Sequence, residues 1–280
     1  FKQQQYDKSV NTLKECLEKE KLTESMDARI RYLLGASMLH TDKTEKALEH
    51  FAAILDMPQK IRPEFEKSLI LRVASLYHRK KDYSKSLQLL NQILPAEDAE
   101  INYRASILKA KLLYAQSKYQ KTIDLLKNLC DRREPQKPAP SPDEDDDKLH
   151  NCTEAYSLLG EAYIEVNDND QAFYAFSKSL RDANPSQEAQ ARAYWGLAKI
   201  YHEEKKWEKS LNKAVNGFIL VNIPTYTPRC MLLAVQALVK MKNFDEALTT
   251  WKEFKERFPA YAQQNKNSPE IKKLLKDKKK

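Results

Sequence analysis

Histidine and cysteine are the residue types in this 280-residue chain that could most directly bind a metal ion or act as nucleophiles. The five histidines stand at positions 40, 50, 78, 150 and 202, with no paired spacing of the kind that zinc sites use. The four cysteines stand at 16, 130, 152 and 230, and none of them forms a Cys-x-x-Cys pair. The sequence therefore predicts no metal site and no cofactor.

Glycine, which phosphate-binding loops require, occurs only at positions 35, 160, 196 and 217. Glycines this widely scattered cannot form such a loop. The Gly-x-Ser-x-Gly motif of hydrolases is absent as well. We therefore expect no catalytic residues, no small-molecule substrate and no enzymatic activity.

Cys130 and Cys152 bracket a segment, residues 131–149, that carries four prolines and an acidic run. The two cysteines should lie near the end of one helix and the start of the next, and these ends should meet in an antiparallel stack. A disulfide there would close a loop of about twenty residues and stabilise the junction by roughly 3 kcal/mol. It would also place the protein in an oxidising compartment. Two ordinary buried thiols are the alternative interpretation.

The overall composition favours helices, because glycine is rare and alanine, leucine, lysine, glutamate and glutamine are abundant. No apolar stretch is long enough to span a bilayer. The net charge of +8 comes largely from a lysine-rich end, residues 272–280. We interpret this end as a solvated tail, which makes nucleic-acid binding an unlikely function.

A short pattern recurs along the chain, in which an aromatic residue is followed three positions later by a small residue and then by an aliphatic one. Tyr83-Ser86-Leu87 and Trp207-Ser210-Leu211 are clear copies. The small residues stand at 9, 47, 86, 122, 172, 210 and 247, so the steps are 38, 39, 36, 50, 38 and 37 residues. Repetition at this interval is typical of a solenoid. Apolar spacings of three and four residues predict two helices in each step.

The units resemble tetratricopeptide repeats. The match is best at Tyr156, Leu159, Gly160, Tyr163, Ala172, Phe176 and Pro185. The resemblance implies an all-α, right-handed superhelical solenoid of stacked antiparallel helix pairs, with about six and a half repeats. The steps of 36–39 residues make the repeats divergent.

The resemblance also divides the chain. Residues 1–130 would form an N-terminal block of a half repeat and three repeats, and residues 150–260 a C-terminal block of three repeats. Residues 131–149 would be a disordered acidic insertion, and residues 261–280 a capping helix with a basic tail. Because residues 1–18 supply only the second helix of a pair, we expect either a piece of a longer solenoid or a chain that begins on a lone helix.

In tetratricopeptide repeats the first helix of each pair lines a concave groove that takes partner segments. Carried over unit by unit, the resemblance places nine residues in that groove: Arg29, Tyr32, Leu71, Arg104, Lys111, Arg192, Trp195, Lys199 and Arg229. Arginine can form paired hydrogen bonds to a carboxylate, and tryptophan is a frequent hot spot of binding. The set predicts a partner segment with acidic and hydrophobic residues. The alternative is that these arginines only solvate exposed helix faces.

The leading hypothesis is therefore a non-catalytic scaffold that binds partner proteins and is a subunit of a larger assembly. An RNA-binding helical-repeat protein and a regulatory domain of a longer multidomain protein are the alternatives. The ending of the last unit, residues 251–259, is similar to repeats of bacterial envelope-assembly proteins, and also to repeats of cytosolic family members. The compartment therefore stays open.

Overall fold

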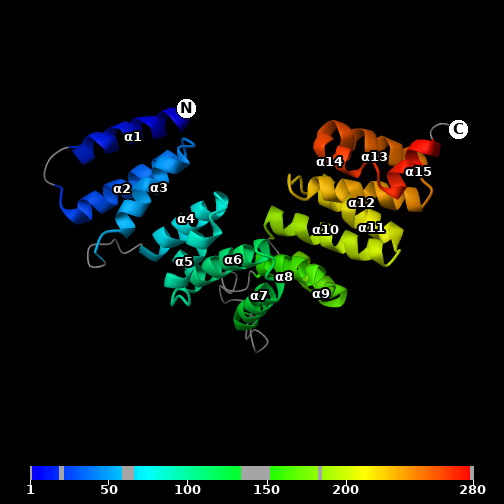
Figure 1. The fold of residues 1–280 in the computed structure, drawn as a ribbon, viewed down its shortest axis with the longest axis horizontal. Helices are drawn as coiled ribbons and strands as arrows, with labels where there is room; N and C mark the ends of the chain where they lie inside the picture. The colour runs from blue at the N-terminus through cyan, green and yellow to red at the C-terminus, as the bar shows by residue number, and fades with distance from the viewer. Residues whose placement is uncertain (1, 19–21, 59–65, 134–151, 182–184, 278–280) are drawn as a thin grey trace, which may run out of the picture. The chain divides into compact units, whose positions relative to one another are not determined.

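The computed structural model describes every residue except 1, 19–21, 59–65, 134–151, 182–184 and 278–280. All regular structure within the described part is α-helical, as predicted (Figure 1). The lone helix α1 (Lys2–Glu18) is followed by six helix pairs. These are α2 (Glu24–Leu39) with α3 (Thr44–Leu55), α4 (Glu66–Arg79) with α5 (Tyr83–Ile93), α6 (Ala99–Ala115) with α7 (Tyr119–Arg133), α8 (Thr153–Glu165) with α9 (Asn169–Arg181), α10 (Gln187–Glu203) with α11 (Trp207–Ile219), and α12 (Thr227–Lys240) with α13 (Phe244–Arg257).

The chain forms two compact units, Phe1–Leu112 and Leu113–Lys280, which we call unit 1 and unit 2. Their boundary falls within α6 and not at the acidic insertion. The reason is that α7 packs directly on α8, although the insertion separates them in the sequence. The first three residues of the predicted insertion, 131–133, belong to α7, and residues 134–149 lie outside the described part.

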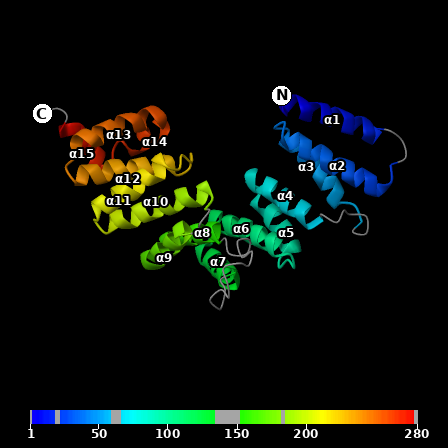
Figure 2. The ribbon, with the colours of Figure 1, turned by 180° about the vertical axis from the view of Figure 1, so that it is seen from behind.

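Within each unit, neighbouring helices in the sequence pack against each other. In unit 1, α1 packs on α2, α2 on α3, α3 on α4 and α4 on α5. In unit 2, the first helices of successive pairs also touch, because α10 contacts both α8 and α12. The two opposite views in Figures 1 and 2 show α10, α11, α12 and α13 side by side. This arrangement puts the side chains of α8, α10 and α12 within reach of one another.

The turn inside each pair has the same geometry throughout the described part. One residue of each turn has a positive φ of 55–63°: Asp42, Lys81, Ser117, Asn167, Lys205 and Lys242. The next amide then donates back to a carbonyl of the first helix, as Asp82 N does to Tyr77 O at 2.9 Å. This is the hydrogen bond of a Schellman motif, which usually has glycine at the left-handed position. Here the chain holds other residues there, at a conformational cost.

The aromatic residue of the recurring pattern is the first residue of the second helix in four of the pairs, at Tyr83, Tyr119, Trp207 and Phe244. At Tyr83, Tyr119 and Trp207 its ring packs on a ring in the last turn of the first helix. The ring of Trp207 lies 4.9 Å from that of His202, and the ring of Tyr83 lies 5.8 Å from that of His78. These contacts explain why each of the two histidines stands five residues before an aromatic residue.

The small residue of the pattern marks the crossing of the two helices, as predicted. Ala47, Ser86, Thr122, Ala172, Ser210 and Ala247 are all fully buried. Two of the hydroxyls bond across the crossing, because Ser86 Oγ donates to Ala74 O at 2.7 Å and Ser210 Oγ to Ala198 O at 2.8 Å. Ser9, in the lone helix α1, is exposed. The pattern thus has its structural role only where a complete pair is present.

Gly35 and Gly160 each face a phenylalanine of their own second helix, whereas Gly196 faces Phe176 of the preceding pair. A Cβ added at Gly160 would lie 2.7 Å from the Phe176 ring, and one added at Gly196 only 2.1 Å from it. Gly35 faces Phe51 in the same way, at 2.6 Å. In the pair α4–α5, Ala74 packs instead with the smaller Leu90. In this pair the absence of glycine thus goes with a smaller side chain on the second helix.

Two short helices follow the last pair. The capping helix predicted within residues 261–280 is α15 (Pro269–Asp277), and its Ile271 and Leu274 are fully buried against α12 and α13. An additional short helix, α14 (Pro259–Asn265), was not predicted. Pro259 ends one unit and also begins α14, because the ring fixes a helical φ and the missing N–H is not needed at the first position.

Candidate functional site

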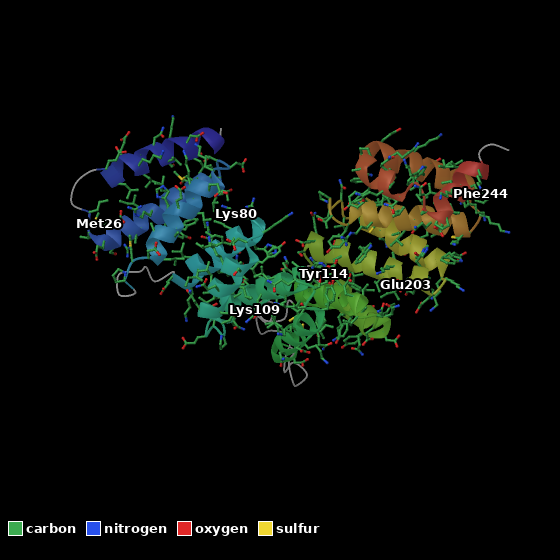
Figure 3. All side chains as sticks on the ribbon, in the orientation of Figure 1. Met26, Lys80, Lys109, Tyr114, Glu203 and Phe244 are labelled. Atoms are coloured by element: carbon green, nitrogen blue, oxygen red, sulfur yellow. The ribbon has the colours of Figure 1, made fainter. Side chains whose placement is uncertain are left out.

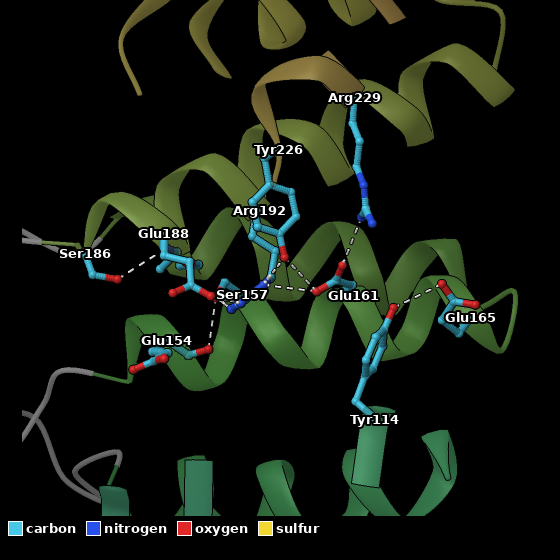
Figure 4. Close-up of polar contacts among 12 residues, drawn as sticks. Tyr114, Glu154, Ser157, Glu161, Glu165, Ser186, Glu188, Arg192, Tyr226 and Arg229 are labelled. Atoms are coloured by element: carbon cyan, nitrogen blue, oxygen red, sulfur yellow. Dashed lines mark hydrogen bonds and ion pairs between the residues drawn. The ribbon is translucent and has the colours of Figure 1, made fainter. Parts of the chain in front are cut away.

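The polar cluster at the centre of unit 2 is built by the first helices α8, α10 and α12. Ser157 and Glu161 are one helical turn apart on α8, so they lie on the same face. Along one face of α10 follow Glu188, Arg192, Trp195 and Lys199 at spacings of four, three and four residues. Tyr226, directly before α12, and Arg229 complete the set. We call these eight residues the α8–α10–α12 cluster, and Figure 4 labels all of them except Trp195 and Lys199.

Arg192 is the centre of this cluster and is only 3% exposed. Its Nε donates to Tyr226 Oη at 2.7 Å and lies 3.0 Å from Glu161 Oε2. Its Nη1 donates to Ser157 Oγ at 2.9 Å, and its Nη2 to Glu188 Oε1 at 2.7 Å. One guanidinium therefore connects α8, α10 and the start of α12, and each of its three nitrogen atoms donates inside the protein (Figure 4).

Both Arg192 and Tyr226 keep their protons in this environment. Burial disfavours the charged guanidinium, but Tyr226, Glu161 and Glu188 outweigh burial and raise the pKa of Arg192. Burial raises the pKa of the Tyr226 phenol, against the opposing charge of Arg192. The phenol can thus donate to Glu161 Oε2, at 3.0 Å, while it accepts from Arg192. The interior of the cluster is a closed network of satisfied groups.

The outer part of the cluster is a tryptophan with two cations. The Arg229 guanidinium lies 5.1 Å from the centre of the Trp195 ring, and Lys199 Nζ lies 5.7 Å from it. Their side chains are 39% and 35% exposed. Arg229 Nη1 is 3.6 Å from Glu161 Oε1, which is too long for a direct hydrogen bond. Both cations can therefore reach a group outside the protein.

Tyr114, near the end of α6, lies beside the cluster and donates to Glu165 Oε1 at 3.1 Å. Burial, together with Glu161 and Glu165, raises the pKa of this phenol, so it stays a donor. Tyr114, Ser157, Glu161, Glu188 and Tyr226 were not among the predicted site residues. Tyr226 lies before a helix start and Tyr114 lies far away in the chain, so no periodic spacing relates them to Arg192. Glu188 lies one helical turn before Arg192, and this spacing could have identified it.

The structure brings together four of the nine predicted groove residues: Arg192, Trp195, Lys199 and Arg229. The placement of Arg192 corrects one expectation, because this side chain is buried and was expected to face a partner. It is buried because Glu161 and Tyr226, which neutralise and cover it, come from the neighbouring repeats.

The other five predicted residues belong to unit 1. Arg29 is exposed on α2, and Arg104 is exposed on α6, where it pairs with Glu100 at 3.9 Å. Tyr32 and Lys111 are half-buried. Leu71 is buried in the core with Ala74 and Leu90, so it is not available to a partner as expected.

The predicted disulfide residues lie at the junction of α7 and α8, as expected. Cys130 and Cys152 are both buried, near the end of α7 and directly before α8. No bond joins the two sulfur atoms in the structure, and the bridge stays a prediction.

Among the described residues, no group of three or more His, Cys, Asp or Glu side chains could hold a metal ion. None of the helices in the described part is long and apolar enough to cross a membrane.

Comparisons with known proteins identify the repeat and the fold. Residues 229–261, which include most of α12 and all of α13, match the tetratricopeptide repeat family. No curated protein matches the chain by sequence.

Solved structures of similar architecture have low sequence identity to the chain. PilF of Pseudomonas aeruginosa is similar with a TM-score of 0.62 and 16% identity, over 91% of this chain and 99% of that one. RapI is similar with a TM-score of 0.64 and 12% identity, over 96% of this chain and 80% of that one. A Rap protein complexed with the competence and sporulation factor gives a TM-score of 0.55 and 16% identity, over 96% and 79%. Together with the helix pairs and their shared turn, these matches identify the chain as a solenoid with the tetratricopeptide-repeat fold.

Proposed function

We propose that this protein is a non-catalytic scaffold that binds a segment of a partner protein on the outer part of the α8–α10–α12 cluster. The observation that carries the proposal is the arrangement of Trp195 beside Lys199 and Arg229, all partly exposed on adjacent first helices. Tetratricopeptide repeats in general mediate protein–protein interaction. The Rap protein, which has a similar fold, was solved in complex with a factor that it binds.

The charges in the cluster define the chemistry of the partner. Arg192 is already neutralised by Glu161 and Glu188, so it contributes no attraction for an acidic ligand. Arg229 and Lys199 keep donors that the protein does not fully use, since their nearest carboxylates lie at 3.6 Å and 4.0 Å. A carboxylate of the partner could accept from either cation. An apolar or aromatic side chain next to it would cover Trp195, and aromatic anchors of this type often dominate binding energy.

The buried network beneath this surface would hold it rigid. Glu161 contacts both Arg192 and Arg229, so the same carboxylate that neutralises the interior also orients the exposed guanidinium. A rigid, preorganised surface loses less conformational entropy when a partner binds. We therefore assign Arg192 a positioning role in place of the contact role that the resemblance implied.

The test is a binding screen of the full chain against a peptide array that varies acidic and aromatic content. We expect selected peptides to carry Asp or Glu within a few residues of an aromatic or large aliphatic residue. Replacing Trp195 by Ala together with Arg229 by Gln should weaken their binding by about 30-fold or more, which corresponds to the loss of about 2 kcal/mol at a hot spot.

A matched control is available on α9. Tyr174 is 52% exposed there, and Lys178 Nζ lies 5.6 Å from its ring centre. The double variant Tyr174→Ala, Lys178→Gln removes the same kind of cation–aromatic pair from α9, which is the second helix of its pair. This variant should bind the selected peptides as tightly as the wild type. Equal loss of binding in both double variants, or equal binding of charge-reversed peptides, would defeat the assignment.

RNA binding is the second candidate, because a tryptophan beside two cations could also stack on a base, and the net charge is +8. Binding to single-stranded RNA that falls steeply with salt concentration would favour this candidate. Peptide binding with a shallow salt dependence would favour the protein partner.

A further inference from the structure

His202, at the end of α10, lies at the junction between the solenoid of unit 2 and its terminal helix α15. Its imidazole packs edge-on against Trp207, with the ring centres 4.9 Å apart. Its Nδ1 is buried and has no hydrogen-bond partner in the described part of the protein. A buried nitrogen of this kind is tolerable as an unprotonated acceptor, but as an N–H donor without an acceptor it would cost considerably more.

Three charged groups face this imidazole. Glu203 comes from α10 itself, Lys240 from the end of α12 and Glu270 from the first turn of α15. Lys240 Nζ and Glu270 Oε1 form an ion pair at 2.9 Å, which ties α15 to α12. Lys240 also lies 6.0 Å from the centre of the Trp207 ring. His202, Trp207 and the ion pair thus form one contact region.

We propose that α15 is a pH-sensitive cap, held in place while His202 is neutral and loosened when this imidazole becomes protonated. Protonation would place an N–H in a buried position without an acceptor. It would also place a positive charge on His202, near the positive charge of Lys240. The charge on His202 would repel Lys240, whose ion pair with the Glu270 carboxylate anchors the helix. Loosening α15 would uncover Leu238, Trp251 and Phe254, over which Ile271 and Leu274 pack.

The titration of His202 agrees in sign with this geometry. Burial, with a smaller contribution from Lys240, lowers the pKa of His202, against the opposing effects of Glu270 and Glu203. Because the pKa of His202 is lower in the folded state than the unfolded value of about 6.5, the folded state around this imidazole has its full stability above that pH. This stability is lost as the pH falls from about 6.5 towards the folded pKa.

The test is native-state hydrogen exchange of the full chain at pH 7.5 and pH 5.5, corrected for the intrinsic effect of pH on exchange. We expect a loss of protection at acidic pH in residues 271–277 of α15. The variant His202→Gln should remove this pH dependence. A pH-dependent loss that persists in His202→Gln would overturn the proposal.

His78 gives the matched control, because it occupies the equivalent position and contacts Tyr83, but lies in unit 1, which does not contain α15. The variant His78→Gln should leave the exchange of α15 as pH-dependent as in the wild type. A second measurement does not depend on any variant: the imidazole of His202 should titrate below its ordinary value in an NMR experiment on the wild-type protein. A normal or raised pKa would refute the cap.

Discussion

At the scale of single residues, Arg192 and Arg229 occupy equivalent positions in successive repeats but have different environments. Arg192 is buried, whereas the Arg229 side chain is 39% exposed. The sequence predicted that both would face a partner, because their spacing along the chain is all that a repeat pattern reveals. Burial of Arg192 depends on Glu161 and Tyr226, which lie 31 residues before it and 34 residues after it. No local pattern contains that information.

Replacing Arg192 by Met should destabilise unit 2 strongly. Breaking a buried ion pair leaves an uncompensated charge, here on Glu161, and typically costs about 3–5 kcal/mol. Replacing Arg229 by Met should cost less than about 1 kcal/mol, because that guanidinium is partly exposed. Denaturant unfolding measures both. Adding Glu161→Gln to Arg192→Met should recover part of the loss, and equal costs for the two arginine variants would contradict the assignment.

The cysteines differ in accessibility, which predicts their reactivity. Burial raises the pKa of the Cys230 thiol to about 12, so almost no thiolate exists at pH 8. Cys16 is only partly buried. Alkylation of the native protein without reductant should therefore modify Cys16 first and leave Cys230 intact until the protein unfolds. Mass spectrometry of the digest measures this order, and early labelling of Cys230 would show that α12 opens locally. The same digest would show whether Cys130 and Cys152 are linked.

At the scale of helices and turns, the starts of the second helices and the positions of the helix crossings follow most directly from the sequence. The second helix begins at the aromatic residue in four pairs, and the small residue lies at the crossing, because both positions are fixed by contacts within one unit. The reason for the retained glycines could not be read from the sequence. Gly196 lies on α10 but faces Phe176 of the preceding unit, so its requirement depends on how two units stack.

Replacing Gly196 by Ala should destabilise unit 2 by about 1–3 kcal/mol, because the new methyl would overlap the Phe176 ring. A better helix propensity would offset part of this cost. In a background with Phe176→Leu the same substitution should cost less, since the smaller side chain leaves room. The double-mutant cycle, measured by thermal or denaturant unfolding, isolates this coupling. Strict additivity would show that the two residues do not compete for space.

The turns offer a stabilising substitution. Lys242 has a φ of 63°, which glycine adopts without strain. Lys242→Gly should therefore stabilise the protein by about 0.5–1 kcal/mol. Its neighbour Met241 is a control, because its φ of −77° is ordinary and glycine there should be destabilising by a similar amount. The denaturation midpoints of the two variants should move in opposite directions, and a shift in the same direction would refute the strain argument.

At the scale of the whole molecule, the repeat period predicted a chain of nearest-neighbour contacts, and the described helices have that arrangement. The compact units divide within α6. The acidic insertion, which composition marks, stands in the sequence between α7 and α8, and these two helices pack directly on each other. Composition reports which segments cannot form a core, whereas the division depends on how densely the ordered helices contact one another. The exposure of Met26 on α2 (Figure 3), whose side chain is 52% accessible, was also not predicted, because the repeat pattern assigns no role to this position.

Packing between neighbouring repeats limits how far a local defect spreads along the chain. In a solenoid, stability is approximately a sum of repeat and interface contributions, so a defect weakens the repeats around it. Arg192→Met should therefore reduce the hydrogen-exchange protection of α8, α10 and α12, whose side chains it connects. Protection of α2 and α3 should stay at the wild-type level, because the helices on which they pack, α1 and α4, belong to unit 1. Ala47→Leu, which overfills the crossing of α2 and α3, should produce the reverse pattern. If either variant lowers protection equally in both units, the chain unfolds as a single cooperative body and the nearest-neighbour description fails.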